Sequence, residues 1–293
     1  MPNLALNLLP RIILLILFLV CGSPISVSNA QPTINPGKIF LVSETQSISN
    51  NTKIIWLGIH HKLKKDWHTY WHYAGDSGHP IKINWSKVSN ANIGEIIWPM
   101  PTVFRTRSLV SYGYKDEVLL LIPLTIRRYG PIRLAATVEW LVCREICIQQ
   151  RSNLEIEIPL GNGRKNAKLK KLFERARSTI PVKLPYKANA TVYENQITLK
   201  LNMPKIILQS IHSVMFLPSL DGMIENSKQQ IWNSQNAGSD NHLKIQMTAG
   251  YGLSDGLNNL DGTIILGTTT KNQYKRRAFD ISNIPLFNKP QQE

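Results

Sequence analysis

Residues 134–158 read LAATVEWLVCREICIQQRSNLEIEI, and this stretch decides the fold. Before the two cysteines, apolar side chains alternate with Thr137 and Glu139, and after them they alternate with Glu155 and Glu157. An alternation with a period of two and one polar face is typical of a half-buried β-strand. The pattern therefore predicts antiparallel strands and a β-sandwich, because the strands of a parallel α/β sheet are apolar on both faces.

Similar short stretches precede this one at residues 53–59, 81–85 and 118–126, and they are rich in β-branched and aromatic residues. Clusters of turn-forming residues separate them, as in Gly75-Asp76-Ser77-Gly78. We therefore expect a mostly β protein in which residues 35–160 form the sandwich domain.

Residues 166–180 break the strand pattern, because their apolar side chains recur at helical spacing: Leu169, Leu172, Phe173, Ala176 and Ile180. This single stripe predicts an amphipathic helix whose basic side faces solvent. Strand-like stretches return afterwards, so we expect the helix to link the sandwich to a second, smaller β domain at residues 188–285. Within that domain, the Asn-, Ser- and Gln-rich residues 226–241 predict a mobile loop.

The first thirty residues predict export. Residues 12–20 (IILLILFLV) are an unbroken apolar run after Arg11, and Ser28-Asn29-Ala30 offers small residues at a cleavage position. A run this short predicts a signal peptide over residues 1–30, cut near Ala30, although an uncleaved anchor stays open. No later run reaches the length of a membrane span, so we expect a soluble, periplasmic mature protein.

The composition excludes several classes of protein. The chain has 293 residues, 43% apolar, with a net charge of 34 − 19 = +15. These values exclude collagenous, coiled-coil and wholly disordered proteins, and three cysteines are too few for a disulfide-dense scaffold. The charge suggests nucleic-acid binding, but the basic residues are scattered and an exported protein seldom meets nucleic acid, so we expect none.

Cys143 and Cys147 are the one sharp chemical feature. Cys21 lies in the predicted signal peptide, which leaves this pair in a compartment where disulfides form. Along a straight strand their Cα atoms would lie about 13 Å apart, whereas a disulfide needs about 4.4–6.8 Å, so a bridge requires a tight turn at residues 144–146. Closing so short a loop would stabilise the fold little, which favours a redox pair over a local structural disulfide, the alternative that stays open.

Several motifs together resemble the N-terminal periplasmic domain of the DsbD/ScsB family of thiol:disulfide reductases. Besides the cysteine segment they are, in order along the chain, Trp67-His68-Thr69-Tyr70-Trp71, Gly75-Asp76-Ser77-Gly78, Ile97-Trp98-Pro99-Met100-Pro101, Tyr112-Gly113-Tyr114 and the stretch 118–126. The resemblance covers about residues 35–160, and the later β region resembles a second segment of the ScsB-like branch. It implies an immunoglobulin-like sandwich.

The resemblance also implies roles for particular residues. Cys143 and Cys147 would be the catalytic pair, with Cys147 forming the mixed disulfide with periplasmic thiol/disulfide partners. A loop that caps the pair in the family would fall at residues 109–114, with Tyr112 shielding the cysteines. Acidic residues found in some family caps are absent at Val110-Ser111. Because the sequence contains no thioredoxin-like Cys-x-x-Cys motif, a separate membrane or thioredoxin-like protein would donate the electrons.

Two further function classes are open. A copper-binding or copper-tolerance protein could use the Cys-x3-Cys pair as soft ligands. A third ligand would then come from one of these candidates: His60, His61, His68, His72, His79 or Met100. A non-redox binding module could present Trp67, Tyr70, Trp71 and Tyr73 as a surface, but core packing is the simpler role for dense aromatics. For the thiol exchanger, we expect no cofactor and no metal.

Overall fold

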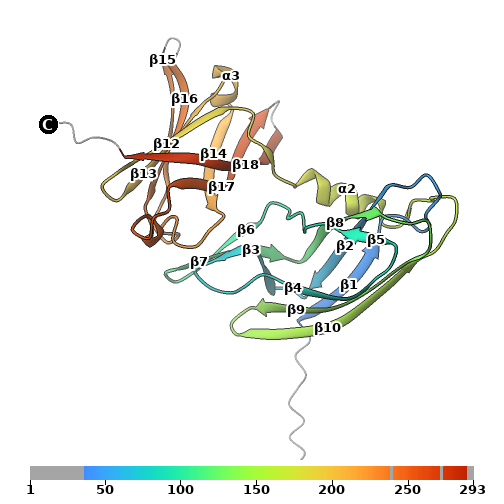
Figure 1. Ribbon diagram of the computed structural model, residues 1–293. Coiled ribbons are helices and arrows are strands. Elements are labelled where there is room, and N and C mark those ends of the chain that lie inside the picture. The colour runs from blue at the N-terminus through green and yellow to red at the C-terminus, as the bar shows by residue number, and fades with distance from the viewer. Residues whose placement is uncertain (1–35, 238–239, 271–272, 289–293) are drawn as a thin grey trace, which may run out of the picture. The chain divides into compact units, whose positions relative to one another are not determined.

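The computed structural model describes residues 36–237, 240–270 and 273–288 (Figure 1). The predicted signal peptide lies outside these residues. Within them the protein is mostly β, as predicted, and antiparallel pairs dominate its sheets. No helix in the described part of the chain is long and apolar enough to cross a membrane.

The first β region consists of two antiparallel sheets. One has the strand order β1-β2-β8-β5, and the other has the order β10-β9-β3-β7-β6, with β4 also paired to β9. The strands are β1 (Gly37–Ser43), β2 (Ile54–Leu63), β3 (His68–Gly75), β4 (Lys82–Val88), β5 (Ala91–Ile93), β6 (Thr102–Thr106), β7 (Leu109–Lys115), β8 (Glu117–Ile126), β9 (Ile132–Cys143) and β10 (Cys147–Ile158).

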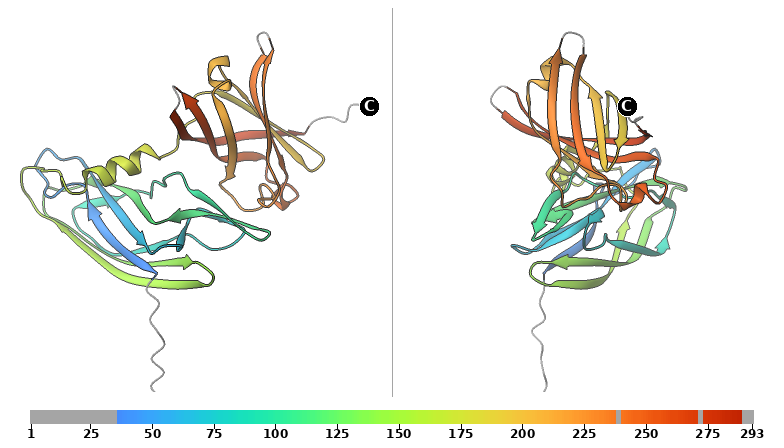
Figure 2. Two further views of the ribbon diagram at one scale, coloured as in Figure 1. Left: turned by 180° about the vertical axis from the view of Figure 1, so that it is seen from behind. Right: turned by 90° about the vertical axis from the view of Figure 1, so that its left-hand side faces the viewer.

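The two sheets share one core and so form the predicted sandwich. Leu57 and Ile59 of the first sheet lie in the same buried cluster as Trp71 and Val138 of the second. The alternation read from the sequence is present in β9, where these side chains are buried: Leu134, Ala136, Val138, Trp140 and Val142. β9 and β10 form a long hairpin, drawn in yellow-green in Figures 1 and 2. The fold is an immunoglobulin-like β-sandwich.

A helix follows within the predicted range. α2 (Lys170–Ser178) buries Phe173 and Ala176 in one cluster with Leu119 and Leu121 of β8, and Figure 1 shows it beside that strand. The Arg177 guanidinium donates to both carboxylate oxygens of Glu44, at 2.7 and 2.9 Å.

The second β region is an eight-stranded sheet of order β14-β17-β18-β12-β13-β16-β15, with β11 paired to β18. Two of its pairs, β11 with β18 and β12 with β18, are parallel. Its elements are β11 (Val182–Lys183), β12 (Lys187–Tyr193), β13 (Gln196–Asn202), α3 (Lys205–Leu208), β14 (Ile211–Pro218), β15 (Ile231–Ala237), β16 (Asp240–Thr248), the 3-10 turn η1 (Tyr251–Leu253), β17 (Asn259–Thr270) and β18 (Gln273–Asn288).

The prediction of a mobile loop over residues 226–241 is wrong for residues 231–237 and 240–241, which lie in strands. β15 occupies part of this range and pairs with β16 in antiparallel register from Ile231↔Gln246 onward. The hydrogen bonds of a strand pair come from the backbone, so polar side chains do not prevent pairing at an edge. Residues 219–230 connect β14 to β15 and include Asn226, which is only 7% exposed.

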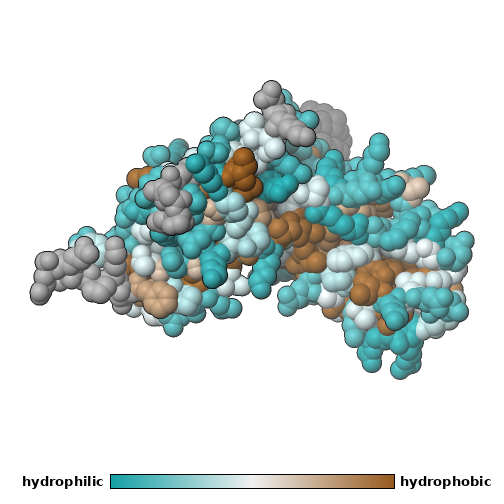
Figure 3. Space-filling model, turned by 90° about the horizontal axis from the view of Figure 1, so that it is seen from above, coloured by the Kyte–Doolittle hydropathy of each residue, from teal (hydrophilic) through white to brown (hydrophobic). Residues whose placement is uncertain are grey.

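The first core extends into the second β region. Leu217, Ile265 and Ala278 belong to the buried cluster that fills the sandwich, and Pro36–Glu293 form one compact unit. The second region also has its own core, which includes Phe216 and Leu243. The domain boundaries at residues 160 and 188 stay a prediction. The face seen in Figure 3 is mostly hydrophilic with separate hydrophobic patches, in keeping with charge spread along the chain.

Candidate redox site

The hairpin turn between β9 and β10 brings the two cysteines together. Cys143 ends β9, Cys147 begins β10, and the two residues are direct partners in the antiparallel register. Their Cα atoms lie 4.1 Å apart and their sulfur atoms are joined in a disulfide. The Arg144 N–H donates to the Ile146 carbonyl at 3.0 Å within the turn. The tight turn expected at residues 144–146 is therefore present.

The two sulfur positions differ in access. Cys143 is 3% exposed, whereas Cys147 and the turn residues before it are exposed, Ile146 by 58%. Cys143 lies in a small buried cluster with Tyr70 and Ala74 that is distinct from the main sandwich core. An incoming thiol therefore meets Cys147 first.

The Tyr70 hydroxyl contacts the disulfide. Tyr70 is in β3, next to β9 in the sheet, and its O–H donates to Cys143 Sγ at 2.9 Å. The same oxygen is 3.8 Å from Cys147 Sγ. Burial raises the pKa of Tyr70 above its ordinary value of 10.0, so at neutral pH the hydroxyl keeps its proton and stays a donor.

Two further aromatic rings stand beside this contact. His68 is the β3 residue opposite Cys143, and its ring stacks on Phe104 with centroids 4.4 Å apart. The His68 ring also meets Tyr70 edge-on at 5.4 Å. Burial lowers the pKa of His68, so the imidazole is neutral at neutral pH. Phe104 belongs to the β6–β7 hairpin, which thus reaches the redox pair through His68.

The turn also contains two charged residues, Arg144 and Glu145. The Arg144 guanidinium stands over the Trp67 ring at 5.5 Å, and its Nε is 3.8 Å from a Glu145 carboxylate oxygen. Both side chains are largely exposed. The Arg144 cation would lower the pKa of a nearby thiol and the Glu145 carboxylate would raise it, and solvent weakens both effects.

The structure does not bring Tyr112, the residue expected to shield the pair, to the disulfide. Tyr70 pairs with Gly113 across β3 and β7, so the neighbouring Tyr112 points to the opposite face of the sheet. Its ring packs near Trp71 and Tyr73, and its hydroxyl donates to the Asn226 side-chain oxygen at 3.0 Å. Among contacts of the described residues, none joins Tyr112 to either cysteine.

The residues that surround the pair, of which Tyr70 contacts it, were only partly visible in the sequence. Tyr70 and His68 lie in the motif Trp67-His68-Thr69-Tyr70-Trp71, but nothing in the spacing singles out the ring that reaches sulfur. No motif or spacing in the sequence pointed to Phe104. The core-packing interpretation of the aromatic cluster is confirmed, since Trp67, Tyr70, Trp71 and Tyr73 are all buried.

The metal-ligand candidates do not converge in the described residues, where no three His, Cys, Asp or Glu side chains are grouped to hold an ion. His60 bonds Glu117 at 2.8 Å, and His61 is buried edge-on against Trp140. His79 lies 3.0 Å from Gln149. Of the six candidates, His68 is the one paired with a cysteine position.

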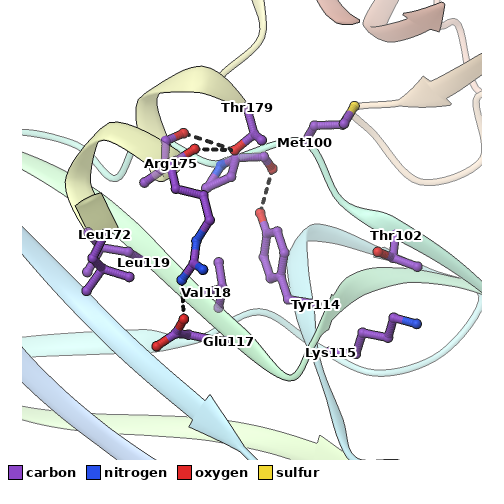
Figure 4. A pocket seen from close by; sticks show the side chains of 12 residues that line it. Met100, Thr102, Tyr114, Lys115, Glu117, Val118, Leu119, Leu172, Arg175 and Thr179 are labelled. Carbon is purple, nitrogen blue, oxygen red and sulfur yellow. Dashed lines mark hydrogen bonds and ion pairs between the residues drawn. The ribbon is translucent and has the colours of Figure 1, made fainter. Parts of the chain in front are cut away.

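A separate cavity of about 210 Å³ lies under α2 (Figure 4). Arg175 points into it and forms an ion pair with Glu117, while the Tyr114 hydroxyl donates to the Pro99 carbonyl at 2.7 Å. Neither cysteine lines this cavity. The candidate site is therefore the exposed hairpin turn and not a pocket.

Fold and site together define an immunoglobulin-like sandwich with a disulfide at an exposed hairpin turn. Residues 37–158 match the family model "Thiol:disulfide interchange protein DsbD, N-terminal". The match confirms the resemblance to DsbD N-terminal domains that the sequence motifs predicted for this part of the chain.

One solved structure agrees on the fold. The N-terminal periplasmic domain of ScsB from Proteus mirabilis is similar with a TM-score of 0.57 and 17% identity, over 86% of this chain and 96% of that one. A conserved domain protein from Bacillus anthracis matches over 85% of each chain, but its TM-score of 0.24 and 7% identity are too low to support a shared fold. No curated protein matches the sequence.

Proposed function

We propose that Cys143 and Cys147 form a reversible redox pair through which an exported protein exchanges electrons with thiol and disulfide proteins in the periplasm. The carrying observation is the asymmetry of the pair: one sulfur is exposed, and the other is buried with a hydroxyl donor 2.9 Å away. The match to the DsbD N-terminal family supports thiol:disulfide interchange as the kind of chemistry.

The asymmetry assigns a role to each sulfur. A partner thiolate attacks Cys147 Sγ, a mixed disulfide forms there, and the bond between the two cysteines breaks. The electron pair of the broken bond passes to Cys143 Sγ, where the Tyr70 O–H stabilises the new thiolate. A second partner thiol then releases Cys147, which leaves both cysteines reduced and the partner oxidised. The same steps run backwards when the reduced pair reduces a partner disulfide.

The proposal includes a location and a source of electrons. A signal peptide over residues 1–30, cut near Ala30, would deliver the chain to the periplasm, the compartment of the ScsB domain. A separate membrane protein or thioredoxin-like protein would reduce the pair. The chain is thus a thiol-disulfide oxidoreductase module that depends on another protein for its electrons.

A redox titration in thiol–disulfide buffers, read by mass spectrometry of labelled thiols, tests the proposal. We expect a reduction potential above about −300 mV, the limit below which structural disulfides typically lie. A pair that stays oxidised far below this potential, or whose reduction unfolds the sandwich, would identify a local structural disulfide instead.

Trapping experiments test the two roles. Cys143→Ser leaves the exposed Cys147 thiol without its resolving neighbour, so mixed disulfides with partners should accumulate. Cys147→Ser leaves only the buried Cys143 and should trap nothing. Equal trapping by both variants would contradict the assignment.

A further inference from the structure

A buried amide from the second β region joins β3, the strand that follows β9 in the sheet order, to β7. Asn226 is 7% exposed, and its Nδ2 donates to the Tyr73 hydroxyl and to Asp76 Oδ1, both at 2.8 Å. Its Oδ1 accepts a hydrogen bond from Tyr112 at 3.0 Å. Tyr73 is in β3, Asp76 follows that strand, and Tyr112 is in β7. All of the polar atoms of the Asn226 side chain are therefore engaged with the sandwich.

Asp76 connects this amide to the backbone of β7. Its second carboxylate oxygen accepts a hydrogen bond from the Val110 N–H at 2.7 Å, and its own N–H donates to the Val110 carbonyl at 2.8 Å. One carboxylate thus satisfies two donors, one from β7 and one from Asn226. Asp76 itself is exposed, so these two hydrogen bonds matter for the position of the turn and not for compensating a buried charge.

The turn that begins at Asp76 lies directly against Tyr70. Gly78 has φ +93°, and a Cβ placed on it would come within 2.2 Å of the Tyr70 ring. Only glycine allows both this backbone conformation and so close an approach. The turn therefore packs directly against the Tyr70 ring, and the hydroxyl of that ring lies 2.9 Å from Cys143 Sγ.

We propose that Asn226 is a positioning residue of the redox pair. It holds Asp76, and Asp76 keeps the turn at residues 76–78 packed against the Tyr70 ring. The ring in turn keeps its hydroxyl within hydrogen-bond distance of Cys143 Sγ. The second β region thereby sets how well the buried sulfur is stabilised as a leaving thiolate. This inference rests on the proposed redox function, because the position of Tyr70 affects exchange only if Cys143 leaves as a thiolate.

Asn226→Asp is the main test, because it keeps the size of the side chain and the acceptor for Tyr112. It replaces the donor to Asp76 with a buried carboxylate 2.8 Å from the Asp76 carboxylate, so the two acids repel and the turn is expected to move. The oxidised variant should be reduced by dithiothreitol about fivefold more slowly than the wild type. Tyr70→Phe, which removes a hydrogen bond to a charged sulfur outright, should slow reduction about tenfold.

The exchanged pair Asp76→Asn with Asn226→Asp is the rescue. An amide at position 76 can accept from Val110 and donate to a carboxylate at position 226, so most of the reduction rate should return. In a Cys147→Ser background, the pKa of the Cys143 thiol, read from its ultraviolet thiolate absorbance, should rise in Asn226→Asp and fall back in the exchanged pair. A purely structural role for Asn226 would not move this value. Asn233→Ala, at an exposed position of β15, is the matched control.

The outcomes separate this inference from the proposed function. A wild-type pair that cannot be reduced reversibly would contradict the proposed function, whereas the Cys143 thiol pKa in the Cys147→Ser background still reports on Asn226. Wild-type reduction rates and an unchanged pKa in Asn226→Asp would overturn the positioning role, as would a slow variant that the exchange does not rescue. If Asn226→Asp fails to fold, Asn226→Ala removes the same bonds without burying a charge; it should slow reduction too, and a wild-type rate would overturn the inference.

Discussion

The two β regions follow the same packing rules, but the cysteine pair lies in one of them. In the sandwich, Tyr70, Ala74 and Cys143 form a small buried cluster separate from the main core. In the second region the core consists of side chains such as Phe216, Leu243 and Ile264, and no cysteine follows Cys147 in the sequence. The difference teaches that stability and reactivity reside in different side chains, so that each should be alterable without the other.

Truncating the second core should have the largest effect on stability. Phe216 is fully buried, so Phe216→Ala should lower the free energy of unfolding by about 3–5 kcal/mol through lost burial and the cavity left behind. Phe287, which is 58% exposed, provides the control, and Phe287→Ala should change stability by less than about 1 kcal/mol. Denaturant unfolding measures both.

Phe216→Ala also tests whether the stability of the second region is independent of the redox pair in the first. The reduction potential of the cysteine pair should stay at the wild-type value in Phe216→Ala, because the hydrogen bonds of Asn226 to the sandwich remain. A shifted potential in the folded variant would show that the second core acts on the redox site by a route other than Asn226.

Acid should destabilise the sandwich through its buried histidines, with the next largest effect. His61 is 3% exposed, and burial, with His60 as a second cause, lowers its pKa from 6.5 to about 4. Burial also lowers the pKa of His72 to about 4. The folded protein keeps both rings neutral while the unfolded chain takes up protons first. Stability from this source is therefore complete above pH 6.5 and falls as the pH drops towards 4.

Replacing His61 should remove part of this acid sensitivity. A shift from 6.5 to about 4 corresponds to about 3 kcal/mol lost on acidification, which His61→Phe should abolish while keeping an aromatic ring against Trp140. Unfolding free energies at a series of pH values between 7 and 4 measure the difference. His212→Phe, at an exposed position, should keep the wild-type pH profile. If His61→Phe has that profile as well, the lowered pKa of His61 is not a source of the acid sensitivity.

Local pattern was enough to predict the strands, the helix and the cysteine turn. Apolar side chains recur at every second position from Leu134 to Val142 and from Leu154 to Ile158, and a period of two sets which side chains are buried. The apolar stripe from Leu169 to Ile180 likewise fixed the buried face of α2. The cysteine spacing then required a tight turn at a place already bounded by two strands.

The contact to sulfur depended on long-range register, which local pattern does not contain. Tyr70 and Tyr112 are both buried tyrosines of neighbouring strands, yet they lie on opposite faces because Tyr70 pairs with Gly113. A shift of one residue would exchange their faces. The pairing between β3 and β7 is also irregular between Tyr70 and Gly75. Asp76, directly after β3, bonds to β7 at the end of this stretch and to Asn226, which is distant in the sequence. The sequence therefore could not tell which tyrosine reaches the cysteines.

The smallest expected effect is that of replacing Tyr70, and it tests whether reactivity in the sandwich can be changed without a large loss of stability. Tyr70→Phe keeps the ring in its cluster and removes the hydroxyl on Cys143, so the free energy of unfolding should fall by only about 1 kcal/mol. A hydrogen bond to a thiolate is stronger than one to a disulfide sulfur, so its loss disfavours the reduced form. The reduction potential should become more negative by about 30 mV, which for two electrons corresponds to about 1.4 kcal/mol.

The sign of that shift has a pH dependence that a packing defect would not show. Below the pKa of the Cys143 thiol the reduced form is protonated and gains little from the Tyr70 donor, so wild type and Tyr70→Phe should have similar potentials there. Above that pKa the potentials should separate, because only the thiolate depends strongly on the hydroxyl. Redox titrations at two pH values, with Tyr129→Phe at an exposed position as the control, measure the separation. A difference that is the same at both pH values would assign the effect of Tyr70 to packing, and the buried cluster around Cys143 would then serve stability as the second core does.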